Sequence, residues 1–139
     1  MNLVDKRRLH PDDVKLWLAV EGAIIRLADF TDTPRLHWIR PLKKSETDVW
    51  WGMYHGYPQH GIEIAVRDWH GPREGWEPKV HRLYQLVDTI AHEMAHAKVG
   101  IRASHGNRWF AAYAHCLDAA VFLDIRFDLL KSGAKFPPE

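Results

Sequence analysis

The sequence predicts one α+β domain with an N-terminal helix, a small, mostly antiparallel sheet of three strands, and two further helices. Apolar residues recur at helical spacing toward both ends of the chain, whereas residues 36–66 hold short runs rich in aromatic and β-branched residues. A length of 139 residues suits one ordinary domain and not two. We therefore expect residues 1–139 to form a single domain, with residues 1–10 and 131–139 flexible.

The first helix is expected from about Pro11 to Asp29. Pro11 is tolerated in a first helical turn, and the acidic side chains of Asp12 and Asp13 favour the positive end of the helix dipole. The turn residues before Pro34 end the pattern. The apolar residues at helical spacing are Val14, Trp17, Leu18, Ile24, Ile25 and Ala28.

Three short strands follow, at residues 36–40, 49–54 and 62–66. Consecutive strands most simply pair as an antiparallel meander, which leaves one edge unpaired. We expect Gly61 to Arg67 to form that edge, unless a loop covers it. Neighbouring side chains on a strand point to opposite faces, so Trp50 and Trp51 cannot both point inward.

Two helices are expected after a Gly- and Pro-containing loop at residues 68–78. Apolar residues recur at helical spacing from Val80 to Ala97, and Gly100 is a natural C-terminal stop. Asn107 is suited to cap the last helix, which continues, whole or broken, to Leu130.

Composition excludes several classes of protein. The 46% hydrophobic and 27% charged residues indicate a globular chain, and the net charge of +1 does not indicate a general DNA-binding surface. The single cysteine, Cys116, excludes an internal disulfide and a cysteine-built zinc module. No apolar run could span a bilayer, and the N-terminus lacks the apolar core of a secretory signal. We expect a cytoplasmic protein without membrane contact.

The strongest chemical signal is His92-Glu93-Met94-Ala95-His96, an H-E-x-x-H motif on the predicted helix 80–97. Residues four apart on a helix lie on one face, so both imidazoles can bind one metal ion. Glu93 follows the first histidine and can reach a water on that ion, as the general base of a zinc hydrolase does.

A catalytic zinc site needs a third protein ligand. No glutamate lies between Glu93 and the final Glu139, and the position six residues after His96 is Arg102. The remaining candidates on this side of the motif are His105, His115, Asp118, Asp124 and Asp128. We favour His105, since its loop could fold back along the motif helix; His115 and Asp118 on the last helix are the alternatives.

The motif, followed by His105-Gly106-Asn107-Arg108-Trp109, resembles the SprT-like minimal zinc metallopeptidases, whose pattern is H-E-x-x-H-A and then H-G-x-x-W. The resemblance covers roughly residues 50–113 and implies a zincin-like fold. It implies one Zn²⁺ ion held by His92, His96 and His105, with Glu93 as the catalytic base of peptide-bond hydrolysis. The gap between His96 and His105 is shorter than in many members.

The substrate is expected to be a polypeptide, bound along the predicted edge strand from Gly61 to Arg67. The better-known members of the family cleave proteins attached to DNA, which makes such proteins an alternative substrate class. A second alternative is a non-catalytic, zinc-stabilised binding module. Candidates for the donor that stabilises the oxyanion are Tyr54, His55, Arg108 and Tyr113, and their spacing does not select one.

Overall fold

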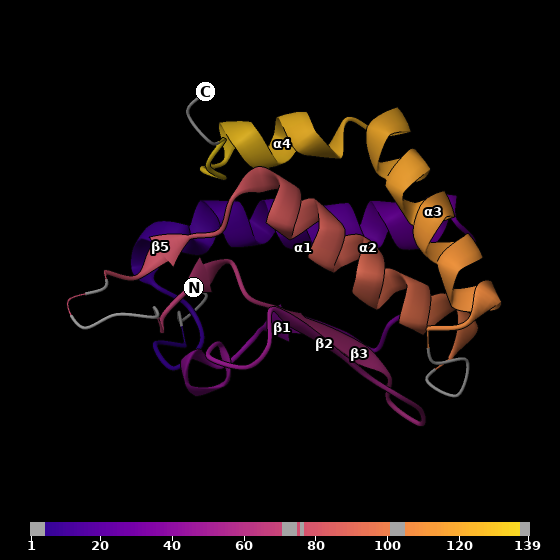
Figure 1. Cartoon of the computed structure of the whole chain (residues 1–139), viewed down its shortest axis with the longest axis horizontal. Helices are drawn as coiled ribbons and strands as arrows, with labels where there is room; N and C mark the ends of the chain where they lie inside the picture. The colour runs from indigo at the N-terminus through magenta and orange to yellow at the C-terminus, as the bar shows by residue number, and fades with distance from the viewer. Residues whose placement is uncertain (1–4, 71–74, 76, 101–104, 137–139) are drawn as a thin grey trace.

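The computed structural model describes residues 5–70, 75, 77–100 and 105–136, and confirms a mixed α+β chain. Its helices lie on one side of a three-stranded sheet, which forms the lower layer in Figure 1. The helices are α1 (Val14–Phe30), α2 (Leu83–Val99), α3 (Asn107–Phe122) and α4 (Ile125–Lys131). The sheet contains β1 (Trp38–Pro41), β2 (Gly52–His55) and β3 (Gly61–Ile64), and a separate pair contains β4 (Arg67–Asp68) and β5 (Lys79–Val80).

The strand order is β1-β3-β2, so the predicted antiparallel meander is wrong. β1 runs parallel to β3, while β2 is antiparallel to it. The long connection between β1 and β2 contains a 3-10 turn at Lys44–Glu46, and it leaves room for β3 to insert between the two strands. The prediction that Gly61 to Arg67 forms an edge is therefore also wrong. β3 pairs on both sides, and Arg67 belongs to the hairpin of β4 with β5.

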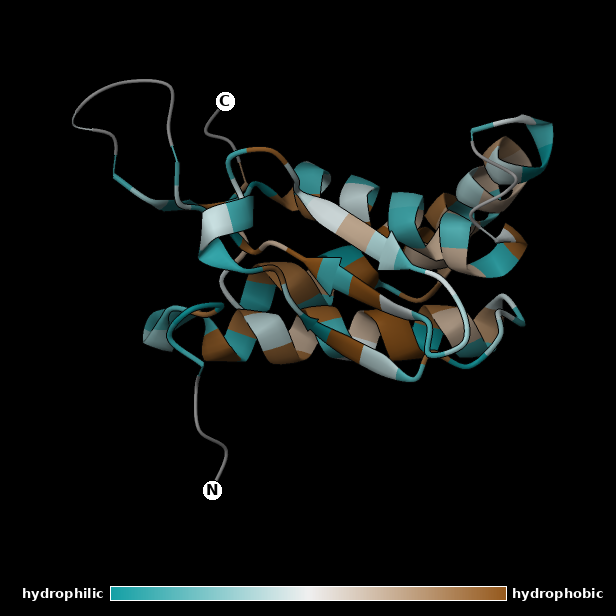
Figure 2. Ribbon diagram, turned by 90° about the horizontal axis from the view of Figure 1, so that it is seen from below, coloured by the Kyte–Doolittle hydropathy of each residue, from teal (hydrophilic) through white to brown (hydrophobic). Residues whose placement is uncertain are grey.

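The core lies between the sheet and the helices. Ile62 and Ile64 of β3 are fully buried against apolar side chains that include Ile24 of α1 and Met94 of α2. Figure 2 shows the sheet from below, on the face that the helices do not cover, with the helices behind it. Cys116 is also buried in this core, and burial raises the pKa of its thiol to about 11, so the thiol is not primed for reaction.

The outer face of the sheet carries a buried carboxylate, Glu63, which is 3% exposed. Its oxygens accept hydrogen bonds from Arg8 at 2.7 Å and Arg40 at 3.2 Å, and one lies 2.6 Å from His55 Nε2. Burial by itself raises the pKa of Glu63. The three partners together lower it by more than burial raises it, so the pKa of Glu63 lies below its ordinary value. The network ties the N-terminal segment to all three strands.

Parts of both terminal segments that we expected to be flexible make contacts with the body of the domain. Leu9 is 6% exposed and belongs to the core, next to the Arg8 that binds Glu63. At the other end Ala134 is 6% exposed, and the carbonyl of Lys135 accepts a hydrogen bond from the Leu83 N–H. Residues 1–4 and 137–139 lie outside the described part of the chain.

Two helix boundaries differ from the prediction. α2 begins at Leu83 because Val80 pairs with Arg67 in the short hairpin. The N-cap of α3 is Gly106, and Asn107 is already helical, so Asn107 does not cap this helix. The last helix breaks at Asp124, whose φ of 55° is left-handed, and continues as α4.

In the described residues no helix has the length and apolar character needed to cross a membrane.

Candidate metal centre

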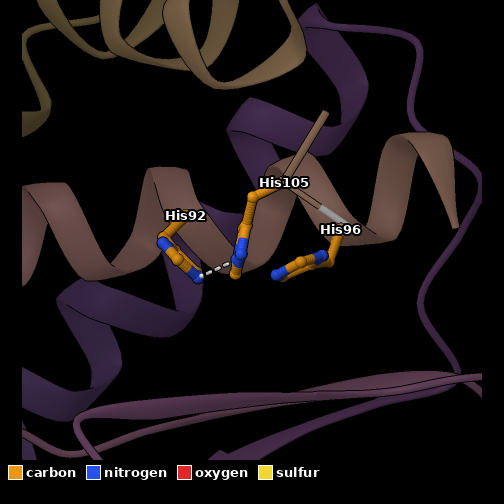
Figure 3. Close-up of side chains that lie close together, drawn as sticks. All are labelled: His92, His96 and His105. Atoms are coloured by element: carbon orange, nitrogen blue, oxygen red, sulfur yellow. Dashed lines mark hydrogen bonds between the residues drawn. The ribbon is translucent and has the colours of Figure 1, made fainter. Parts of the chain in front are cut away.

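Three histidine side chains converge at the C-terminal half of α2. His92 and His96 lie one helical turn apart on the same face, and His105 reaches back from just before α3. Figure 3 shows the three rings pointing toward one another above the sheet. The ring centroids are 5.0–5.1 Å apart, and one ring nitrogen from each histidine lies within 4.8 Å of the others. This cluster could hold one metal ion.

His105, which we favoured because its loop could fold back along the motif helix, lies with His92 and His96 in this cluster. Its Nε2 lies 3.3 Å from the Nε2 of His92. Among the described histidine, cysteine and carboxylate side chains, these three histidines form a group that could hold a metal ion. The alternatives lie elsewhere: His115 and Asp118 are exposed on α3, and Asp128 pairs with Arg26.

Burial favours the neutral form of the two imidazoles on α2. Burial, with a smaller contribution from neighbouring histidines, lowers the pKa of His96 to about 4. Burial also lowers the pKa of His92. A neutral imidazole has a free lone pair on one nitrogen and can bind a metal without first losing a proton. The donor set therefore fits a divalent transition-metal ion.

Trp109 supports the cluster from behind. The centroid of its ring lies 4.7 Å from that of His105 and 4.8 Å from that of His92, and its Nε1–H donates to the His92 carbonyl at 3.3 Å. Tyr113, one turn later on α3, stacks on Trp109 at 5.0 Å. The Tyr113 hydroxyl donates to Asp88 of α2, and this bond raises the pKa of Tyr113 to about 12. These contacts join α3 to the face of α2 that carries the histidines.

Glu93 lies in the same cavity as the histidines, although it is only 5% exposed. Burial raises the pKa of its carboxyl group to about 7. β2 passes close to it: a Cβ atom on Gly52 would lie 2.7 Å from Thr89 Cγ2 and 3.1 Å from Glu93 Cγ. Gly52 is thus a position of close approach beside the cavity that sequence reasoning missed, although a glycine inside a strand pattern often indicates such an approach.

The cavity has a volume of about 480 Å³ and two unlike walls. One wall is formed by α2 and His105, and the other by residues 49–54, which include β2 and the residues before it. The lining residues are Val49, Trp50, Trp51, Gly52, Met53, Tyr54, Asp88, Thr89, His92, Glu93, His96 and His105.

Three of the four candidate oxyanion donors are engaged elsewhere. The Tyr54 hydroxyl lies 3.0 Å from His60 Nδ1, and the Tyr113 hydroxyl binds Asp88. His55 binds Glu63 in the network on the outer face of the sheet. Arg108, the fourth, is exposed in the first turn of α3. Of these four candidates, Tyr54 is the one that lines the cavity among the described residues, and the centroid of its ring lies 6.4 Å from that of His96.

Comparison with known proteins found no match among family models, curated proteins or solved structures. What the geometry establishes is a three-histidine cluster in an α+β chain, with a buried carboxyl group in the same cavity.

Proposed function

We propose that the chain is a SprT-like zinc metalloendopeptidase with a zincin-like fold. The observation that carries the proposal is the position of Glu93 in the cavity that also holds His92, His96 and His105. Three histidines are the protein ligands of a catalytic zinc site, whereas a structural site is closed by four ligands and needs no adjacent base. The H-E-x-x-H spacing and the downstream His105 support the same class.

Zinc, when bound by the three histidines, would supply Lewis-acid activation of a water molecule and of the scissile carbonyl group. Glu93 would accept the proton of that water and transfer it to the leaving amine. Its position suits this role, since Glu93 lines the same cavity as the three histidines. The Trp109 ring would hold the imidazoles in position.

An extended substrate would pair with β2, the edge strand that lines the cavity. The register of β2 and β3 places Trp51 opposite Ala65, and the Ala65 N–H donates to the Trp51 carbonyl. Trp51 and Ala65 therefore form a hydrogen-bonded pair that extends the antiparallel ladder by one position. Hydrogen-bonded pairs alternate along antiparallel strands, so the backbone groups of Gly52 and Tyr54 are directed away from β3. These groups would pair with the backbone of the peptide.

The test compares zinc content and cleavage of an unfolded protein for the wild type and Glu93→Gln. We expect one zinc ion per chain in both proteins, and a loss of cleavage of at least about 100-fold in the variant, because the base is removed while the ligands remain. Glu77→Gln, at an exposed glutamate outside the cavity, is the matched control and should retain full activity.

Two other results would change the proposal. A wild-type protein that takes up no zinc would refute it. Zinc in both proteins without cleavage by either would instead indicate a metal-stabilised binding module. Single-stranded DNA added to the same assay tests the alternative substrate class, since proteins attached to DNA should then be cleaved faster.

A further inference from the structure

Three consecutive apolar residues line the cavity beside the histidines and are exposed. Val49 is 68%, Trp50 is 50% and Trp51 is 49% exposed, and all three line the cavity that holds Glu93. Large apolar side chains left in water next to a polar centre are typical of a surface that a ligand covers. We call these three residues the apolar wall.

Hydrogen bonds and packing fix the apolar wall in place. The Val49 and Trp50 N–H groups donate to the Glu46 carbonyl at 3.2 Å and 3.0 Å. The Trp51 carbonyl accepts a 2.8 Å hydrogen bond from Ala65, and the Trp51 ring packs 5.6 Å from the buried His81. Because its backbone is already held in one conformation, this segment loses little backbone entropy when a ligand covers it.

The charges of the cavity also restrict the ligand. The carboxyl-bearing side chains among the described lining residues are Asp88 and Glu93, and none of those lining residues is a lysine or an arginine. Asp88 already accepts the hydroxyl hydrogen of Tyr113. An acidic substrate side chain would find no lysine or arginine partner among the described lining residues, whereas an apolar one would bury surface against the two tryptophans.

We infer that the apolar wall binds a bulky apolar side chain of the substrate, so that the enzyme cleaves beside aromatic or large aliphatic residues. The inference rests on the proposed peptidase function and adds its substrate preference. Continuity with the catalytic cavity identifies the occupant: a peptide paired with β2 places side chains over the residues that directly precede this strand.

The experiment measures kcat/KM of the zinc-loaded protein on peptides that differ only in the residue on either side of the scissile bond. The series contains Phe, Leu, Ala, Asp and Lys at each of these two positions. We expect Phe or Leu to be preferred over Ala by about 10-fold or more at one of them, with Asp the poorest substrate. Cleavage sites in an unfolded protein, identified by mass spectrometry, should show the same preference.

Trp50→Ala should reduce this Phe-to-Ala ratio several-fold, and Trp50→Phe should restore most of it. Phe122→Ala, which removes an exposed aromatic residue outside the cavity, should leave the ratio unchanged. Zinc content and thermal unfolding of each variant show that the site and fold are intact. Trp51→Ala is the second variant, since Trp51 contributes the adjacent part of the wall.

The outcomes separate this inference from the proposed function. Cleavage with equal rates for Phe, Ala and Asp would overturn the inference and leave the peptidase intact. A preference for Lys, or a ratio unchanged in both tryptophan variants, would overturn it as well. A wild-type protein that binds zinc but cleaves none of the peptides and no unfolded protein would refute both.

Discussion

Gly52 lies where β2 passes the helix that carries Glu93. A Cβ atom at this position would lie 2.7 Å from Thr89 Cγ2, and real Cβ atoms do not approach so closely. Gly52→Ala should therefore push β2 away from α2 and displace Glu93. We expect a loss of about 1–3 kcal/mol in the free energy of unfolding, measured by urea denaturation, and reduced peptide cleavage.

Gly56→Ala is the matched control for this prediction. It adds the same methyl group just beyond the other end of β2, where no atom lies within 4 Å of the new Cβ. Equal stability and activity of the two variants would show that the close approach at Gly52 does not position the site.

Single residues also show what sequence alone can and cannot reveal. His92 and His96 could be placed on one helix face because helical spacing is a local property. The choice of His105 rests on a loop that could fold back along the motif helix, since four other candidate ligands also follow the motif. The roles of Gly52 and Asp88 depend on which elements pack together. Their neighbours in space are 37 and 25 residues away in the sequence, Thr89 and Tyr113 respectively.

At the scale of elements, the helices could be predicted more reliably than the sheet. The apolar periodicity of α1 and α2 is present in each segment alone. Strand order is not a local property: the parallel pairing of Trp38 with Gly61 joins residues separated by a whole intervening strand. This pairing requires a glycine at position 61, because a side chain there would overlap the Trp38 ring.

The packing of α2 with α3 determines the geometry of the three-histidine cluster. Trp109 belongs to α3, yet its ring contacts histidines on α2, so Trp109→Ala should allow His105 to move relative to His92. We expect zinc affinity, measured by competition with a chelator, to fall by about 10–100-fold. Tyr84→Ala, at an exposed aromatic residue on α2, should leave it unchanged; equal affinities in the two variants would contradict this role of Trp109.

At the scale of the whole molecule, Glu63 joins the N-terminal segment to β1, β2 and β3. Because its partners hold its pKa below 4.5 in the folded chain, it stabilises the fold at pH values above about 4.5. This stabilisation is lost as the pH falls further through the folded-state pKa. Glu63→Gln should lower the free energy of unfolding by about 1–3 kcal/mol at pH 7, and by less near pH 3.

Urea denaturation at both pH values tests this prediction, with the exposed Glu77→Gln as control. A Glu63→Gln deficit that is the same at pH 3 and pH 7 would show that the charge of Glu63 does not contribute.

The location of bound zinc tests the central claim most directly. A crystal of the zinc-loaded protein, with diffraction data collected on both sides of the zinc absorption edge, should give one anomalous peak per chain. We expect this peak about 2.0–2.1 Å from a ring nitrogen of each of His92, His96 and His105, with Glu93 beside the remaining position. A peak elsewhere, a peak without His105, or no peak after loading would contradict the account.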